Sequence, residues 1–135
     1  MKIMLIIPTL SFGGAERVMS ELATEFALQK NAVQLVLLAK SNDCYKTHPT
    51  VQIHRLGFQN KGEFKKIIAE IETFWKLRRL LKREKPDAVL SFMEKYNVFV
   101  ILATRGLGLK VFISDRSNPK SAIPKHIDIL RKLSY

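Results

Sequence analysis

Two adjacent glycines at the start of an amphipathic segment are the residues best suited to hold a ligand. Gly13 and Gly14 end an apolar run and precede apolar residues that recur at helical spacing, namely Val18, Met19, Leu22 and Phe26. The first N–H groups of a helix are unpaired, and glycines let a ligand approach the main chain closely. The segment therefore predicts a site for a phosphate or another negatively charged or hydroxyl-rich group. The alternative is a tight turn that only requires glycine.

Alternating strands and helices must position this turn. Apolar runs predict five strands, over residues 2–8, 32–39, 51–56, 87–92 and 110–114. Amphipathic spacing predicts three helices, over residues 15–29, 64–85 and from 96 or 97 to 105. The nearly all-apolar second run is typical of a parallel strand covered on both faces, whereas the third alternates enough to lie nearer an edge. We therefore expect an α/β fold with a doubly wound, mostly parallel sheet flanked by helices.

The long second helix has enough apolar residues to cover a sheet. We expect its buried side to carry Phe64, Ile67, Ile68, Ile71, Phe74, Trp75 and Leu81. Ligands of doubly wound sheets bind beyond the carboxyl ends of the strands, where the strand order reverses. Residues 9–14, 92–97 and 115–118 all follow predicted strands, so we expect them to share one rim.

These segments resemble the amino-terminal domain of retaining GT-B glycosyltransferases, known as glycosyltransferase group 1 or family 4. In that family the first strand runs into Pro-Thr-Leu-x-x-Gly-Gly-Ala-Glu-Arg, which residues 8–17 match. A later strand ends in Ser-Asp/Glu-Arg-x-x-Pro, which residues 114–119 match. Ser91, Phe92 and Asn97 reproduce a Ser-Phe strand end followed by an Asn-bearing helix. The resemblance covers nearly the whole chain and implies the Rossmann-like half of a GT-B fold.

The resemblance also implies where substrates bind. The substrate-binding candidates are Gly13, Gly14, Glu16, Arg17, Lys95, Asn97, Asp115 and Arg116. Glu94 is the catalytic candidate, because it and Lys95 lie where related enzymes place a residue near the reacting sugar. That residue is often a histidine, which this chain lacks there.

Several of these residues also suit purely structural roles. Glu16 alternatively complements the positive end of the helix dipole. Asp115 and Arg116 alternatively form a helix cap and a surface pair, although an arginine beside the glycines can also grip an acceptor phosphate with two hydrogen bonds.

The family resemblance implies transfer of a sugar from a nucleotide-sugar donor to a saccharide or lipid-linked acceptor, in polysaccharide or glycolipid synthesis, with neither metal nor other cofactor. In this family a carboxy-terminal domain supplies most donor contacts, and nothing like it is found in these 135 residues. We therefore expect residues 1–135 to be the acceptor-side domain, incomplete at its carboxyl end and inactive alone. The alternative is a non-catalytic Rossmann-like binding module, or a truncated relic, that binds a saccharide or an anionic surface.

Other ligand classes fit the sequence poorly. The glycine turn lacks the Gly-x-Gly-x-x-Gly spacing of dinucleotide-binding proteins, and the second strand ends at Ala39-Lys40 with no acidic residue at its tip. No Gly-Lys-Ser/Thr follows the first strand, which excludes a P-loop. His48, His54 and His126 lack the spacing of metal ligands.

Basic residues outnumber acidic ones, 23 to 12, which gives a net charge of +11. Their excess is concentrated between residues 55 and 85, around the long helix. A basic helix with aromatic residues on its other face can lie on an anionic membrane and so reach a lipid-linked acceptor. The alternative is that Phe74 and Trp75 face the sheet and the lysines only form a solvated surface. We do not expect nucleic acid as a partner, because no known binding motif is present.

The single cysteine, Cys44, suits a reducing compartment. Pro8 and Thr9 break the apolar run at the amino terminus, so we interpret this run as a strand rather than a signal peptide. No apolar run approaches the roughly 20 residues that a membrane-spanning helix needs. We therefore expect a cytoplasmic protein that is peripheral at the inner face of a membrane.

Overall fold

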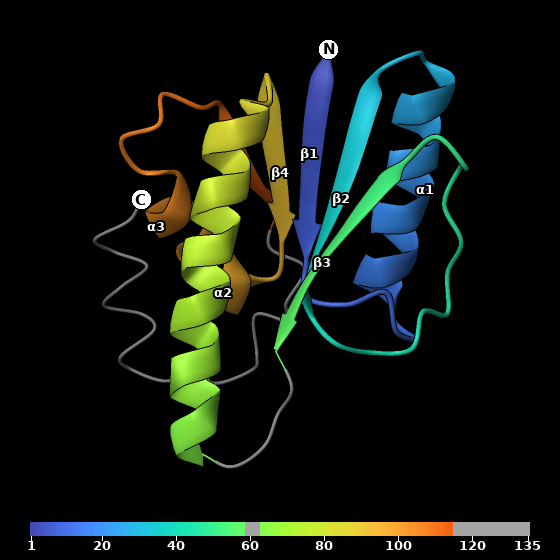
Figure 1. Cartoon of the computed structure of the whole chain (residues 1–135). Coiled ribbons are helices and arrows are strands. Elements are labelled where there is room, and N and C mark those ends of the chain that lie inside the picture. Colours follow the sequence, from blue (N-terminus) through green and yellow to red (C-terminus); the bar gives the residue numbers. More distant parts are fainter. Residues whose placement is uncertain (59–62, 115–135) are drawn as a thin grey trace.

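Five parallel strands form one sheet at the centre of the protein (Figure 1). The computed structural model describes residues 1–58 and 63–114. The strands are β1 (Lys2–Ile7), β2 (Ala32–Ala39), β3 (Gln52–Phe58), β4 (Ala88–Phe92) and β5 (Val111–Ser114), in the order β3-β2-β1-β4-β5. All four neighbouring pairs are parallel, and in the central pair Lys2 lies opposite Ala32 and Ile7 opposite Leu37. The predicted fold class and the edge position of the third strand are confirmed.

One face of the sheet is covered by α1 (Gly14–Leu28) (Figure 1). Met19 and Ala23 of this helix are fully buried, while Val18, Leu22 and Phe26 pack beside them. They meet every second residue of the central strands, such as Leu5 and Leu35. The amphipathic face predicted after the glycines is therefore the face that contacts the sheet.

The opposite face is covered by α2 (Glu63–Glu84) and α3 (Glu94–Thr104). The intervening residues of β1 and β2 point this way, among them Met4, Ile6 and Val36, which are fully buried. A near-continuous apolar sequence in both central strands is explained by this arrangement, because each strand is covered on both faces.

The orientation of α2 differs from the sequence prediction. Thr73, Leu77, Leu80 and Leu81 are its buried residues, and Phe74 is partly buried. Four residues expected in the core lie on the surface instead, with exposed fractions of 58% for Ile67, 66% for Ile68, 54% for Ile71 and 55% for Trp75. The helix thus has two apolar faces, and the leucine-rich one contacts the sheet. The side chain of Phe64 lies outside the described residues.

The third helix begins at Glu94, two or three residues earlier than the predicted start at residue 96 or 97. Asn97 N–H donates to the carbonyl of Met93 at 2.9 Å, so Glu94 and Lys95 lie in the first helical turn. After Thr104 the chain passes through Gly106, whose φ of 77° is in the region that favours glycine, as predicted for the residue that closes this helix.

Candidate functional site

The predicted rim is built around the carboxyl ends of β1 and β4, which are neighbours in the sheet. The chain moves from β1 outward to β2 and β3, then returns to the other side of β1 at β4, so the strand order reverses here. Helix α1 starts just after β1 on one face, and α3 starts just after β4 on the other. This is the position at which parallel α/β sheets bind ligands.

Neither glycine of the rim adopts a backbone conformation that favours glycine. Gly13 has a φ of −179°, which is extended, and Gly14 is not among the residues with positive φ. A Cβ atom on Gly13 would lie 2.2 Å from Oε2 of Glu16, so a side chain there would require the Glu16 carboxylate to move. A Cβ on Gly14 would meet no atom within 4 Å. A tight turn that merely needs glycine therefore does not explain Gly14, which borders open space at the start of α1.

Glu16 and Arg17 point in different directions from the first turn of α1. Glu16 is buried, with its carboxylate against Gly13. Arg17 is exposed, and its Nε donates to Oε1 of Glu21 at 2.9 Å. This hydrogen bond and the charge of Glu21 raise the pKa of Arg17 above its ordinary value, and nearby Tyr45 adds to the effect. Glu16 thus borders the glycine turn, whereas Arg17 presents a polar edge to solvent.

The strand-to-helix junction after β4 contains a strained residue that the sequence does not predict. Met93 has φ 79° and ψ 121°, values rare for a residue with a side chain. Such strain costs about 1–3 kcal/mol and is common at functional sites. No sequence signal marks it, because methionine is not a turn residue. It lets Phe92 end the strand and Glu94 start the helix with one residue between them.

Lys95 lies on the side of the sheet away from the glycines. It lines a pocket between α2 and α3 with Tyr96 and Glu70, and its Nζ is 5.8 Å from the centre of the Tyr96 ring. Burial, and secondarily the charge of Glu70, raises the pKa of Tyr96 above its ordinary value. The structure therefore places Lys95 and Arg17 at the same edge but on opposite faces of the sheet.

Asn97 is fully buried and faces the interior. Its Nδ2 donates to the backbone carbonyl of Ser114 at 3.3 Å, which ties the start of α3 to the last residue of β5. Asn97 Oδ1 and the buried Ser91 Oγ have no hydrogen-bond partner among the residues that the structure describes. Asp115 and Arg116 lie outside the described residues, but Asn97 holds the strand end that leads into them.

Two aromatic residues of the rim were not predicted as site residues. Phe12, directly before the glycines, stacks on Tyr45 of the β2–β3 loop. Their proximity could not be predicted from spacing, because they belong to loops that follow different strands. A phenylalanine directly before a glycine pair is the signal of them that the sequence offers.

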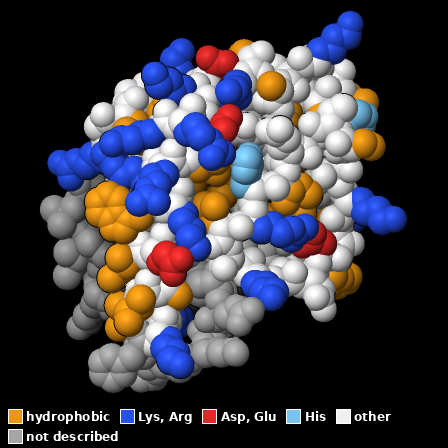
Figure 2. Space-filling view, in the orientation of Figure 1, with side chains coloured by type: hydrophobic (Ala, Val, Ile, Leu, Met, Phe, Trp, Pro, Cys, Tyr) orange, Lys and Arg blue, Asp and Glu red, His pale blue; other side chains and the backbone are white. Residues whose placement is uncertain are grey.

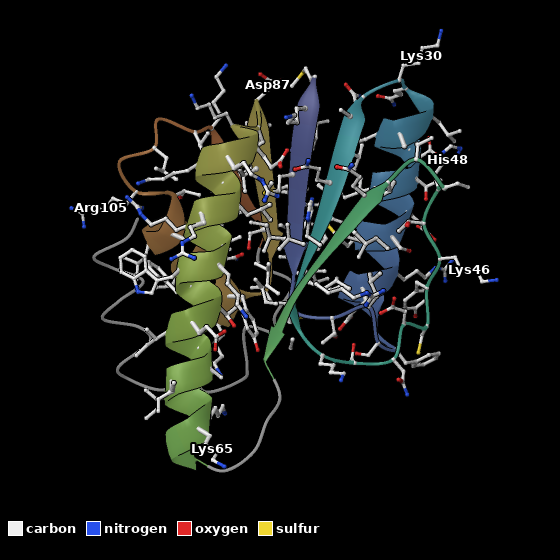
Figure 3. All side chains as sticks on the ribbon, viewed as in Figure 1. Lys30, Lys46, His48, Lys65, Asp87 and Arg105 are labelled. Atoms are coloured by element: carbon white, nitrogen blue, oxygen red, sulfur yellow. The ribbon has the colours of Figure 1, made fainter. Side chains whose placement is uncertain are left out.

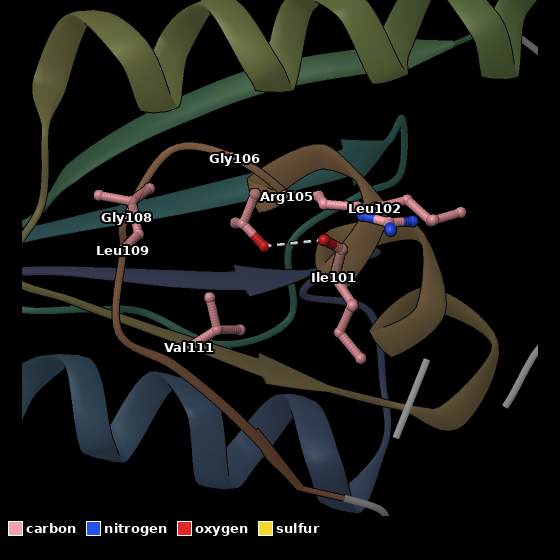
Figure 4. A pocket seen from close by; sticks show the side chains of 8 residues that line it. Ile101, Leu102, Arg105, Gly106, Gly108, Leu109 and Val111 are labelled. Carbon is pink, nitrogen blue, oxygen red and sulfur yellow. Dashed lines mark hydrogen bonds between the residues drawn. The ribbon is translucent and has the colours of Figure 1, made fainter. Parts of the chain in front are cut away.

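The pocket beside α3 is separate from this rim. Thr104, Arg105, Gly106 and Val111 are among its lining residues, and Thr104 Oγ1 lies 3.0 Å from the carbonyl of Ile101 (Figure 4). Val111 is the first residue of β5, so this pocket lies at the amino edge of the sheet. Within residues 1–58 and 63–114, no group of three or more His, Cys, Asp or Glu is placed to hold a metal ion.

A curated protein that matches this chain acts, by its name, on a lipid-linked saccharide. It is GalNAc-alpha-(1->4)-GalNAc-alpha-(1->3)-diNAcBac-PP-undecaprenol alpha-1,4-N-acetyl-D-galactosaminyltransferase from Campylobacter jejuni subsp. jejuni serotype O:2. The two sequences are 34% identical over 136 aligned positions, which include all of this chain and 38% of the relative. The chain thus spans well under half the length of the enzyme that it resembles.

Two solved structures share the architecture of this chain. Sucrose-phosphate synthase from Thermosynechococcus elongatus superimposes with a TM-score of 0.73 at 10% identity, covering 98% of this chain and 39% of that one. Apo UGT2 from Phytolacca americana gives a TM-score of 0.58 at 13% identity, covering 87% of this chain and 30% of that one. At such identities the likeness shows the fold alone, which is the Rossmann-like half of a GT-B fold.

The family assignment rests on the sequence profile described as Glycosyltransferase Family 4, which matches residues 12–132. The match begins at Phe12, beside the glycine turn, and runs through both helix starts of the rim. The chain therefore belongs to glycosyltransferase family 4.

Proposed function

We propose that this chain is the acceptor-side half of a glycosyltransferase that moves a sugar from a nucleotide-sugar donor to a lipid-linked saccharide. Supporting this is the open space over Gly14, at the point where the strand order reverses. A side chain is compatible with the fold at that position, so a ligand that packs against the main chain accounts for the glycine. The named acceptor of the Campylobacter jejuni relative supports the choice of a lipid-linked saccharide.

The donor is proposed to bind in a second domain that these 135 residues do not include. The chain accounts for 38% of the relative's length, which leaves room for such a domain. Transfer would then occur between two domains, mainly by positioning the acceptor hydroxyl and stabilising charge at the sugar carbon. Glu94 stays our candidate for a group near the reacting sugar, and Arg116 for an acceptor-phosphate contact.

We also propose that α2 brings the enzyme to an anionic membrane at its cytoplasmic face. The exposed stripe of Ile67, Ile68, Ile71 and Trp75 is continuous along the helix, and Lys65 and Lys76 flank it. Figure 2 shows apolar and basic side chains side by side over α2. An apolar stripe beside cationic groups is the pattern of a helix that lies in a membrane interface.

Basic residues continue from α2 toward β3. His54, Lys76, Arg79 and Arg83 line a shallow pocket between these two elements. The positive charge therefore extends along one side of the proposed membrane face, where anionic headgroups would be attracted. None of the helices in the described part of the chain is both long and apolar enough to cross a membrane.

The decisive experiment is a transfer assay on the protein at its native length in the source cell. It should be incubated with a panel of nucleotide sugars and with undecaprenyl-pyrophosphate-linked saccharides, and products should be resolved by mass. We expect one nucleotide sugar to add one or more residues to a lipid-linked acceptor. Saccharide binding with no transfer from any donor would instead identify the alternative, a non-catalytic binding module.

A further inference from the structure

The loops after β1 and β2 are joined by main-chain hydrogen bonds. Ala39 N–H donates to the carbonyl of Pro8, and Cys44 N–H donates to the carbonyl of Leu10, both at 2.8 Å. These bonds link the segment that leads into the glycine turn to the last residue of β2 and to the loop between β2 and β3. The two loops therefore form one joined surface at the rim.

An aromatic pair lies on this surface. The rings of Phe12 and Tyr45 are nearly parallel, with 19° between their planes and 6.4 Å between their centres. Phe12 is 89% exposed, more than any other large apolar side chain that the structure describes. Tyr45 lies beside one face of the Phe12 ring but covers little of it, so an apolar ring face is open to water beside Gly13.

Polar groups border this ring pair. Tyr45 lies close enough to Arg17 to interact with its charge, and Arg17 is held in an exposed ion pair with Glu21. The guanidinium offers donors, and the carboxylate offers acceptors. Lys46, next to Tyr45, points outward from the same loop (Figure 3). The surface thus combines a flat apolar face with hydrogen-bonding groups at its edge.

We propose that Phe12 and Tyr45 form a stacking platform for a pyranose ring of the acceptor saccharide. A pyranose has a face of C–H groups, which packs on an aromatic ring, and hydroxyl groups around its edge, which need polar partners. The Phe12 ring would pack on the C–H face of the sugar, while Arg17 and Glu21 would be the polar partners of its hydroxyl groups. This deepens the proposed function and rests on it, since it assigns the acceptor sugar to one part of the rim.

A saccharide fits this surface better than a lipid chain does. The apolar area consists of two rings bordered by charged residues, whereas the continuous apolar stripe lies on α2. Helix α2 covers the other face of the sheet from α1, so a membrane-bound α2 would leave the platform free for the sugar part of a lipid-linked acceptor.

Saturation-transfer NMR on the native-length protein tests the platform without any donor. The probe is an α-1,4-linked disaccharide of N-acetylgalactosamine, and the variants are Phe12→Ala, Phe12→Leu and Phe12→Tyr. We expect transfer to C–H protons on one face of a ring, and about tenfold weaker binding in the Ala and Leu variants. Phe12→Tyr should bind as the wild type does, because it keeps the ring. Since Phe12 is 89% exposed, none of these changes should unfold the protein.

Phe112→Ala is the matched control, because Phe112 is also highly exposed, at 57%, but lies on β5. It should leave disaccharide binding unchanged. The platform is refuted by wild-type protein that binds no disaccharide, by a Phe12→Leu variant that binds normally, or by an equal loss in Phe112→Ala.

The acceptor KM separates this proposal from the proposed function. Normal transfer with an unchanged acceptor KM in Phe12→Leu would reject the platform and keep the glycosyltransferase assignment. Ring-dependent disaccharide binding without transfer from any nucleotide sugar would keep the platform and reject the enzyme.

Discussion

At position 14 the fold and the proposed ligand place different demands on the side chain. At Gly13 a Cβ would overlap the Glu16 carboxylate, so a side chain there would require Glu16 to change its position. Gly14 is the first residue of α1, has room for a side chain and has no left-handed conformation to maintain. Many residues could satisfy the helix there, and most would favour it over glycine by up to about 1 kcal/mol.

We therefore expect Gly14→Leu to preserve or slightly raise the free energy of unfolding while reducing sugar transfer at least about tenfold, because the side chain would occupy the ligand's space. Denaturant unfolding and acceptor-dependent transfer rates measure the two effects. Glu25→Leu, an exposed change on the same helix, is the control and should leave transfer intact. Normal transfer in Gly14→Leu would show that nothing packs against this part of the main chain.

At the scale of elements, α2 shows what periodicity alone cannot decide. Its apolar residues form two faces, and the sequence prediction assigned the isoleucine face to the sheet. The leucine face packs there instead, around Leu77 and Leu81, which are fully buried. Both faces satisfy helical spacing, so the choice depends on tertiary packing.

The prediction that belongs to α2 is membrane binding through its isoleucine face. The variant Ile68→Gln/Trp75→Gln should bind vesicles of anionic phosphatidylglycerol at least about tenfold more weakly than the wild type does, because it removes apolar area that would enter the interface. Co-sedimentation measures this, with neutral phosphatidylcholine vesicles for comparison. Phe112→Gln is the matched exposed control. If the double variant binds like the wild type, the isoleucine face has another partner.

The strands and the rim were easier to predict than the contacts within the rim. Apolar runs and their spacing predicted all five strands, and two of the segments expected to share a rim follow β1 and β4, which are neighbours in the sheet. The strain at Met93 and the Phe12–Tyr45 stack were missed. The backbone conformation of Met93 is imposed by its surroundings, because methionine does not favour it. The aromatic pair joins two loops that are far apart in the sequence, so no local pattern predicts it.

At the scale of the whole molecule, a polar network joins four elements at the amino edge of the sheet. Glu84 Oε2 accepts a hydrogen bond from Gln34 Nε2 at 2.9 Å, while Lys2 Nζ donates to the Glu84 carbonyl, also at 2.9 Å. Gln34 Nε2 also donates to Gln52 at 3.1 Å. Hydrogen bonds from Gln34, then from Arg83 and Lys2, lower the pKa of Glu84 to about 2.

This lowered pKa predicts a stability loss in acid. In the unfolded chain Glu84 has its ordinary pKa of 4.5, so between pH 4.5 and about 2 the unfolded state binds more protons. The stabilisation from this carboxylate is therefore present above pH 4.5 and is lost as pH falls toward 2. In urea unfolding, the wild type should exceed Glu84→Gln in stability at pH 7 and approach it near pH 2.

Glu72→Gln serves as the control, because Glu72 pairs with Lys76 on the exposed side of α2. The difference in stability between Glu72→Gln and the wild type should change little between pH 7 and about pH 2, since surface pairs contribute little to stability. If the stability difference between the wild type and Glu84→Gln stayed constant with pH, the Glu84 carboxylate would not stabilise the fold through this network.

The separation of this network from the rim has a consequence for how the family diversifies. The bonds around Glu84 lie at the amino edge, whereas the glycine turn and the aromatic pair lie at the carboxyl edge. The two loops at the rim are joined through backbone atoms, which persist whatever side chains they carry. The side chains at Phe12 and Tyr45 can therefore be exchanged, and the ligand of the proposed platform changed with them, while the amino edge preserves a scaffold that still folds.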